Sequence, residues 1–120
     1  MIHHVALETD PEVLAEEILF WQLAGFVEVP VPTPVDQGHV WLEREGTQVH
    51  LMSLTDPTVP LRGHVAIVAP DFDATLRRLR SAGFELQEGR ELWGERRAKA
   101  RTPAGHTVEL MAAPPAPRAG

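Results

Sequence analysis

The sequence predicts an α+β fold made of two tandem copies of one module, each with the order strand, helix and three further strands. Three pairs of similar segments predict the duplication, because they occur in the same order with spacings of 58 to 60 residues. The pairs are 4–7 with 64–67, 24–26 with 82–84, and 46–52 with 105–111. A nearly constant spacing indicates an internal repeat, here of roughly 55–60 residues. We therefore expect a single domain over residues 1–113, with modules at 1–56 and 61–113 and a flexible tail at 114–120.

The composition limits the classes of protein to be considered. The chain has 120 residues and no cysteine, which excludes disulfides, zinc–thiolate sites, iron–sulfur clusters and thiol nucleophiles. Its formal charge of −6 argues against a nucleic-acid partner, which needs a basic face. No run approaches the ~20 apolar residues of a membrane span, and the first residues lack the pattern of a signal peptide. We expect a cytoplasmic protein that binds neither nucleic acid nor membranes.

In the first module, the alternation of apolar and polar residues over 2–8 predicts a strand. Asp10-Pro11 predicts the start of a helix, because aspartate is a favoured cap and proline a favoured first residue, and Gly25 predicts its end. A short strand at 26–29 is followed by a proline-rich loop. Strands at 38–44 and 47–54 form a hairpin around Glu45-Gly46.

The second module repeats this plan. A strand at 64–68 precedes a helix that Asp71 caps and Gly83 ends. A strand at 84–87, a loop at 89–94 that holds Trp93, and strands at 96–102 and 107–112 complete the module. Residues 103–105 form the turn between its last two strands.

Candidate metal ligands share one face of the predicted sheets. Each sheet must bury one face against its helix, and the natural apolar set is Val5, Leu7, Val49, Leu51, Val65, Ile67, Val108 and Leu110. Alternation then places His4, His50, His64 and Glu109 on the opposite, concave face. Imidazole and carboxylate groups that converge from rigid strands are typical of a metal site, and Fe(II), Mn(II), Ni(II), Co(II) and Zn(II) all suit three nitrogens and one oxygen. The alternative is four unrelated polar residues in a solvated groove.

The same alternation supplies candidate substrate contacts. His39 and Trp41 lie in the concavity of the first sheet, and Arg97, Lys99 and Arg101 lie in that of the second. The basic residues suit an anionic or oxygen-rich substrate near a cation, or they form a solvated basic edge. Trp41 and Trp93 either wall a pocket or pack against neighbours. The substrate-binding set is therefore His39, Trp41, Trp93, Arg97 and Lys99.

Two further histidines and one tryptophan are interpreted as structural. By alternation His3 falls on the helix side, at the end of the strand. His106 sits in the turn before the last strand, and Trp21 has the helical spacing of a core residue.

Five segments of the chain read HVAL at 4–7, FW at 20–21, LAGF at 23–26, GHVAI at 63–67 and PAGHTVEL at 103–110. They resemble the vicinal oxygen chelate superfamily, which includes glyoxalase I, methylmalonyl-CoA epimerase, fosfomycin-resistance thiol transferases, extradiol dioxygenases and bleomycin-resistance proteins. The resemblance covers residues 2–112. It implies a cupped eight-stranded mixed sheet around one divalent metal, with the helices on the outer face.

The resemblance also implies roles for single residues. His4, His64 and Glu109 fall on ligand positions of the family, and His50 falls on a position that is glutamate in glyoxalase I and glutamine in the epimerases. The implied function is a metal-dependent lyase, isomerase or dioxygenase that holds two adjacent oxygens of a small substrate on the metal. Glu109, or a water on the metal, would move the proton.

Two alternatives remain open at this stage. The first is a protein of the bleomycin-resistance type, which sequesters a small molecule such as an antibiotic without turnover. The second concerns assembly. The resemblance implies a homodimer in which His4 and His50 of one subunit meet His64 and Glu109 of the other, and the sequence alone does not decide between this and a site within one chain.

Overall fold

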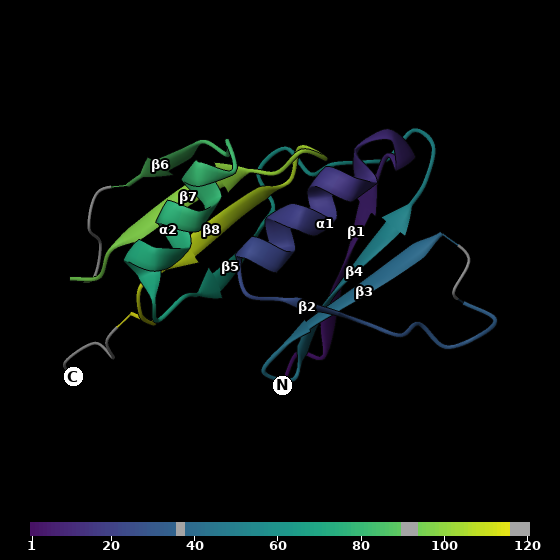
Figure 1. Ribbon diagram of the computed structural model, residues 1–120, viewed down its shortest axis with the longest axis horizontal. Helices are drawn as coiled ribbons and strands as arrows, with labels where there is room; N and C mark the ends of the chain where they lie inside the picture. The colour runs from purple at the N-terminus through teal and green to yellow at the C-terminus, as the bar shows by residue number, and fades with distance from the viewer. Residues whose placement is uncertain (36–37, 90–93, 116–120) are drawn as a thin grey trace.

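The computed structural model describes residues 1–35, 38–89 and 94–115, and it divides the chain into two halves with the same order of elements (Figure 1). The first half contains β1 (His4–Thr9), a 3₁₀ turn η1 (Pro11–Val13), α1 (Leu14–Leu23), β2 (Val27–Val29), β3 (His39–Arg44) and β4 (Thr47–Ser53). The second half contains β5 (His64–Val68), α2 (Phe72–Ser81), β6 (Leu86–Glu88), β7 (Arg97–Arg101) and β8 (Thr107–Met111). The bounds predicted from the sequence agree with these to within two residues at each end, except that α1 begins at Leu14, three residues after the predicted first helical residue, Pro11. No helix within the described ranges is long and apolar enough to cross a bilayer.

The two halves form four-stranded mixed sheets of identical topology. Their strand orders are β1-β4-β3-β2 and β5-β8-β7-β6. In each sheet one parallel pair, β1 with β4 and β5 with β8, adjoins an antiparallel hairpin. The α+β fold of paired modules is thereby confirmed. The eight strands that the structure describes are divided between two sheets, and among these strands β1 and β5 are outer ones that hydrogen-bond on one side only.

The apolar faces of both sheets and both helices share one core. Its buried residues include Phe20 and Trp21 of α1, Leu79 of α2, and Leu51 and Leu110 of the sheets. Figure 1 shows α1 and α2 side by side in the middle of the molecule, where they pack against each other. The alternation predicted for the strands is confirmed. Trp21 is fully buried, as its helical spacing predicts.

Local capping follows the sequence at the first helix and departs from it at the second. The carboxylate of Asp10 accepts a hydrogen bond from the Glu12 amide at 2.8 Å, and the next turn is 3₁₀ rather than α. Gly25 has φ +101°, a conformation that favours glycine, and it ends the first helix as expected. Asp71 occupies the cap position of α2, yet its carboxylate accepts from the side chains of Thr75 and Arg78 instead of from the backbone.

Glu17 of α1 is a charged residue whose side chain is fully buried. One carboxylate oxygen accepts a hydrogen bond from Nε1 of Trp21 at 3.1 Å. The other accepts from the backbone amide of Ala104 at 2.8 Å, in the turn before β8. A buried carboxylate is costly unless it is hydrogen-bonded, and these two donors meet that need. Glu17 therefore ties α1 of the first half to the second half.

A second buried polar contact joins the halves at the ends of the strands. Nε2 of His106 lies 2.7 Å from the backbone oxygen of Glu8, near the end of β1, and donates to it. His106 is itself buried, with an exposed fraction of 4%. Its interpretation as a structural turn residue therefore fits its contacts. Together, Glu17 and His106 fix how the two sheets sit relative to each other.

The Glu17 contact predicts a large and specific effect on stability. Replacing Glu17 with alanine leaves the Ala104 amide and the Trp21 indole without an acceptor, so the free energy of unfolding should fall by about 2–4 kcal/mol. Chemical denaturation measures this change. The matched control is Glu16→Ala, one residue earlier on the exposed face of the same helix, which should change the unfolding free energy by less than about 0.5 kcal/mol. Equal effects of the two substitutions would contradict the structural role of Glu17.

Candidate functional site

Three aromatic rings form a parallel stack on the face of the first sheet that lies opposite the core. His50 of β4 lies directly across from Trp41 of β3, and their ring centroids are 4.0 Å apart with an interplanar angle of 2°. The ring of His4 stacks on His50 at 4.0 Å and 12°. Two rings cannot occupy the same face, so His50 lies between His4 and Trp41. The ring of His50 therefore covers one face of the Trp41 indole. Only the remaining surface of Trp41 can contact a substrate.

Gln48 and Glu43 determine which nitrogen of His50 carries the proton. Nε2 of Gln48 donates to a carboxylate oxygen of Glu43 at 3.0 Å, which turns the amide oxygen of Gln48 toward His50 at 2.7 Å. An amide oxygen only accepts, so Nε2 of His50 must be the protonated nitrogen. Nδ1 of His50 is left with its lone pair. Sequence reasoning missed Gln48, although its two-residue spacing to His50 on one strand indicates that both side chains share a face.

The environment of His50 favours its neutral form. Burial and, after it, repulsion by His4, His3 and His39 together lower the pKa of His50 from 6.5 to about 4. Neutral imidazole is the form that binds a metal ion.

Two further histidines lie near this stack. His3 is not on the helix side, since its Nδ1 lies 3.0 Å from Nδ1 of His4 and its ring centroid lies 6.4 Å from that of His50. The expected alternation fails because His3 precedes the first residue of β1. His39, at the start of β3, has a buried Nδ1 with no hydrogen-bond partner among the described residues. The face is therefore rich in imidazole nitrogens.

The second sheet carries a histidine–carboxylate pair on its corresponding face. Nε2 of His64 lies 3.4 Å from Oε2 of Glu109, and Nδ1 of His64 lies 3.1 Å from the backbone oxygen of Arg62. The carbonyl oxygen can only accept, so it favours a proton on Nδ1 and leaves the Nε2 lone pair facing the Glu109 carboxylate. Two electron-rich groups at this distance repel each other unless the imidazole is protonated or a cation is shared between them.

The three basic residues of β7 differ in their surroundings. Nη1 of Arg97 donates to Oε1 of Glu109 at 3.3 Å, so Arg97 holds the carboxylate. Lys99 and Arg101 instead line an open groove of about 830 Å³ beside His64. Trp93, the remaining expected substrate contact, lies outside the described residues.

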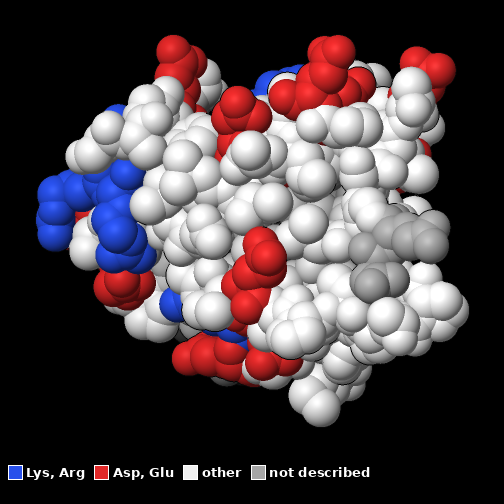
Figure 2. All heavy atoms as spheres, turned by 45° about the vertical axis from the view of Figure 1, so that its right-hand side comes forward, with Lys and Arg blue, Asp and Glu red and all other residues white. Residues whose placement is uncertain are grey.

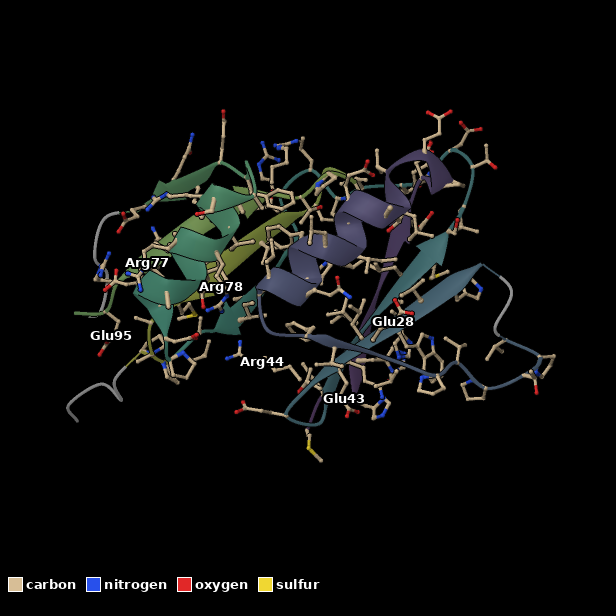
Figure 3. The ribbon with its side chains drawn as sticks, in the orientation of Figure 1. Glu28, Glu43, Arg44, Arg77, Arg78 and Glu95 are labelled. Atoms are coloured by element: carbon tan, nitrogen blue, oxygen red, sulfur yellow. The ribbon has the colours of Figure 1, made fainter. Side chains whose placement is uncertain are left out.

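The candidate ligands form two separate pairs in a single chain. His4 and His50 meet on the first sheet, and His64 and Glu109 meet on the second. Within the part of the chain that the structure describes, no group of three histidine, aspartate or glutamate side chains is arranged to hold a metal ion. The expected substrate contacts are divided likewise, with His39 and Trp41 on the first sheet. Figure 3 labels Glu43 on β3 of the first half and Arg77 on α2 of the second half.

Comparisons with known proteins identify the family. The sequence matches the Glyoxalase/Bleomycin resistance protein/Dioxygenase superfamily over residues 17–110, and the chain belongs to this superfamily. A search of curated protein sequences finds no match.

Solved structures share the fold at low sequence identity. A glyoxalase family protein from Bacillus anthracis superposes with a TM-score of 0.82 at 21% identity, covering 92% of this chain and 93% of that one. The fosfomycin resistance protein FosX from Listeria monocytogenes, in complex with Mn(II) and a dihydroxypropylphosphonic acid, gives 0.74 at 16% identity, covering 95% and 93%. Lactoylglutathione lyase from Agrobacterium tumefaciens gives 0.69 at 20% identity, covering 92% of each chain. At these identities the similarity establishes the fold.

The lowered pKa of His50 predicts a pH-dependent stability. Because this pKa is about 4 in the folded chain and 6.5 for an unperturbed histidine of the unfolded chain, the unfolded chain binds more protons between these values. The stability contributed by neutral His50 is present above pH 6.5 and is lost as the pH falls to 4, by about 1–3 kcal/mol. Denaturation of metal-free protein across this range measures the loss. In His50→Gln the unfolding free energy should change less with pH over this range. An unchanged pH dependence would contradict its attribution to His50.

The contact of Gln48 with His50 predicts a single tautomer. In wild-type protein, ¹⁵N NMR of the imidazole should show His50 protonated at Nε2 and bare at Nδ1. In Gln48→Leu the acceptor is lost, so the spectrum should shift toward a mixture of the two tautomers. Glu28→Gln, a substitution of an exposed glutamate on β2, is the control and should leave the tautomer unchanged. A wild-type His50 protonated at Nδ1 would contradict the hydrogen-bond assignment.

Proposed function

We propose that the protein is a divalent-metal-dependent enzyme of its superfamily that acts on a small oxygen-rich substrate. Its site would be shared between two chains, with His4 and His50 from one and His64 and Glu109 from the other. The observation that carries the proposal is the separation of these residues into two complementary pairs on the faces of the two sheets that lie opposite the core. Lyase, isomerase and oxygenase chemistry are all compatible with the four ligands.

The donor atoms of both pairs suit a metal ion. The bare Nδ1 of His50 and the Nε2 of His64 are lone-pair donors fixed by hydrogen bonds at the other ring nitrogen, which is typical of histidine ligands. A cation would also relieve the repulsion between His64 and Glu109. Three nitrogens and one carboxylate oxygen suit Fe(II), Mn(II), Co(II), Ni(II) or Zn(II).

The distribution of charge supports pairing of unlike halves. Residues 1–60 contain ten acidic residues and one basic residue, a formal charge of −9, and residues 61–120 contain seven acidic and ten basic residues, a charge of +3. Figure 2 shows basic side chains gathered toward one side of the molecule. In a two-fold dimer the first half of each chain can face the second half of its partner, so the opposite charges attract twice. The outer strands β1 and β5 would lie at this junction.

The residues of the site indicate how the chain would assist the reaction. A bound divalent metal supplies a Lewis acid that holds two adjacent substrate oxygens and stabilises negative charge on them. Glu109, or a water on the metal, would take a proton from the substrate, and Arg97, which donates to Oε1 of Glu109, would hold this carboxylate in orientation. The Trp41–His50–His4 stack gives the opposite wall a rigid face. Rigid donors favour a single geometry for the bound substrate.

Metal content of mixed dimers tests the shared site directly. A chain carrying His50→Ala and a chain carrying Glu109→Ala, with different tags, are co-expressed and the mixed dimer is isolated. One of its two sites combines the mutated residues, and the other is intact, so the dimer should bind about half the wild-type amount of metal. The control is a dimer in which both chains carry His50→Ala, which should bind little metal. Elemental analysis gives both values.

Other outcomes would each contradict the proposal. Equal metal contents in the mixed and control dimers would mean that the two pairs do not meet across chains. A wild-type protein that takes up none of the five metals would favour the sequestering function of the bleomycin-resistance type. A monomer with stoichiometric metal would place the site within one chain.

A further inference from the structure

We propose that the groove on the second sheet binds an anionic oxygen group of the substrate, such as a phosphate or a phosphonate, through Lys99, Arg101 and Arg62. The inference rests on the proposed function and extends it by naming the class of substrate. Neither the family match nor the arrangement of metal ligands assigns this role to Arg62 or Arg101.

The geometry of the groove places the three cations around one space. Lys99 and Arg101 are two residues apart on β7, so both project from the face opposite the core. Arg62 lies in the segment that leads into β5. All three line the groove of about 830 Å³, which also contains His64 and a single acidic lining residue, Glu85. The groove is therefore positively charged in a chain whose overall charge is −6.

These three cations differ from four arginines of the second half, which form ion pairs. Arg78, Arg80, Arg96 and Arg97 each have a carboxylate oxygen within 3.4 Å. Across the described ranges, Lys99, Arg101 and Arg62 have no carboxylate within 4.0 Å. Positive groups that share a groove without a counter-ion repel one another, and a dianion relieves this repulsion.

The groove adjoins the proposed metal ligands. His64 is one of its lining residues, and Lys99 lies directly across from Glu109 in the β7–β8 pair. An anionic group held by Lys99 and Arg101 would therefore position the rest of a small molecule at His64 and Glu109. Arg97, which the sequence suggested as a substrate contact, is bound to Glu109, so the anion-binding role falls to its neighbours on the same face.

Binding of inorganic phosphate to metal-free, full-length protein tests the inference. Because the metal is removed with chelator, the measurement does not depend on the proposed metal site. Isothermal titration at low ionic strength should detect binding, and Arg101→Gln should weaken it at least about fivefold, as expected for loss of one charge-assisted contact. Arg77→Gln removes an exposed arginine on α2, outside the groove, and should leave the affinity unchanged.

Three results would overturn the inference. Phosphate affinity that is unchanged in Arg101→Gln, with the fold confirmed by its thermal transition, would exclude the groove. Equal losses of phosphate affinity in Arg101→Gln and Arg77→Gln would indicate that phosphate is attracted by overall charge only. A weakened dimer in Arg101→Gln, with unchanged phosphate affinity, would mean that Arg101 pairs with acidic residues of the second chain. Loss of metal binding with retained phosphate binding would contradict the proposed function alone.

Discussion

The buried carboxylate of Glu17 is the contact on which the arrangement of the molecule depends. Glu17 lies on α1 and accepts hydrogen bonds from Trp21 on the same helix and from the Ala104 amide in the other half. With the His106 contact to Glu8, it fixes the angle between the two sheets. In the resulting arrangement each sheet presents its own pair of candidate ligands. Each pair lies within one sheet because its two strands are neighbours there, and the Glu17 and His106 contacts join the two sheets far from the candidate ligands.

The two faces are complementary in chemistry as well as in position. The first presents neutral imidazoles, held by ring stacking and by the Glu43–Gln48–His50 hydrogen bonds. The second presents a carboxylate held by Arg97 and a groove lined by cations. The proposed metal site takes donors from both faces, and the proposed anion-binding groove lies on the second face. The second face therefore carries two of the proposed metal ligands and, beside them, the residues proposed to bind the anionic group of the substrate.

Much of the fold could be predicted from the sequence because duplication and alternation are strong local signals. Alternation correctly placed Val49 and Leu110 in the core and Lys99 on the opposite face. It failed for His3, which precedes the strand. The burial of Glu17 could not be predicted, because it depends on the backbone amide of Ala104, which is distant in the chain. The ion pairs of the basic residues could not be predicted from the sequence either. Arg97 was therefore grouped with Lys99, although of these two only Arg97 binds the Glu109 carboxylate. The proposed convergence of the four candidate ligands requires association between chains, which no local pattern encodes.

The central claim is that one metal ion is held by residues of two chains. A crystal structure of protein loaded with a single metal, with anomalous scattering recorded at that metal's absorption edge, tests this claim most directly. The account predicts one metal per chain, bound by Nδ1 of His50 and a nitrogen of His4 from one subunit and by His64 and Glu109 from the other. A metal bound by all four residues of a single chain, or bound away from them, would contradict it.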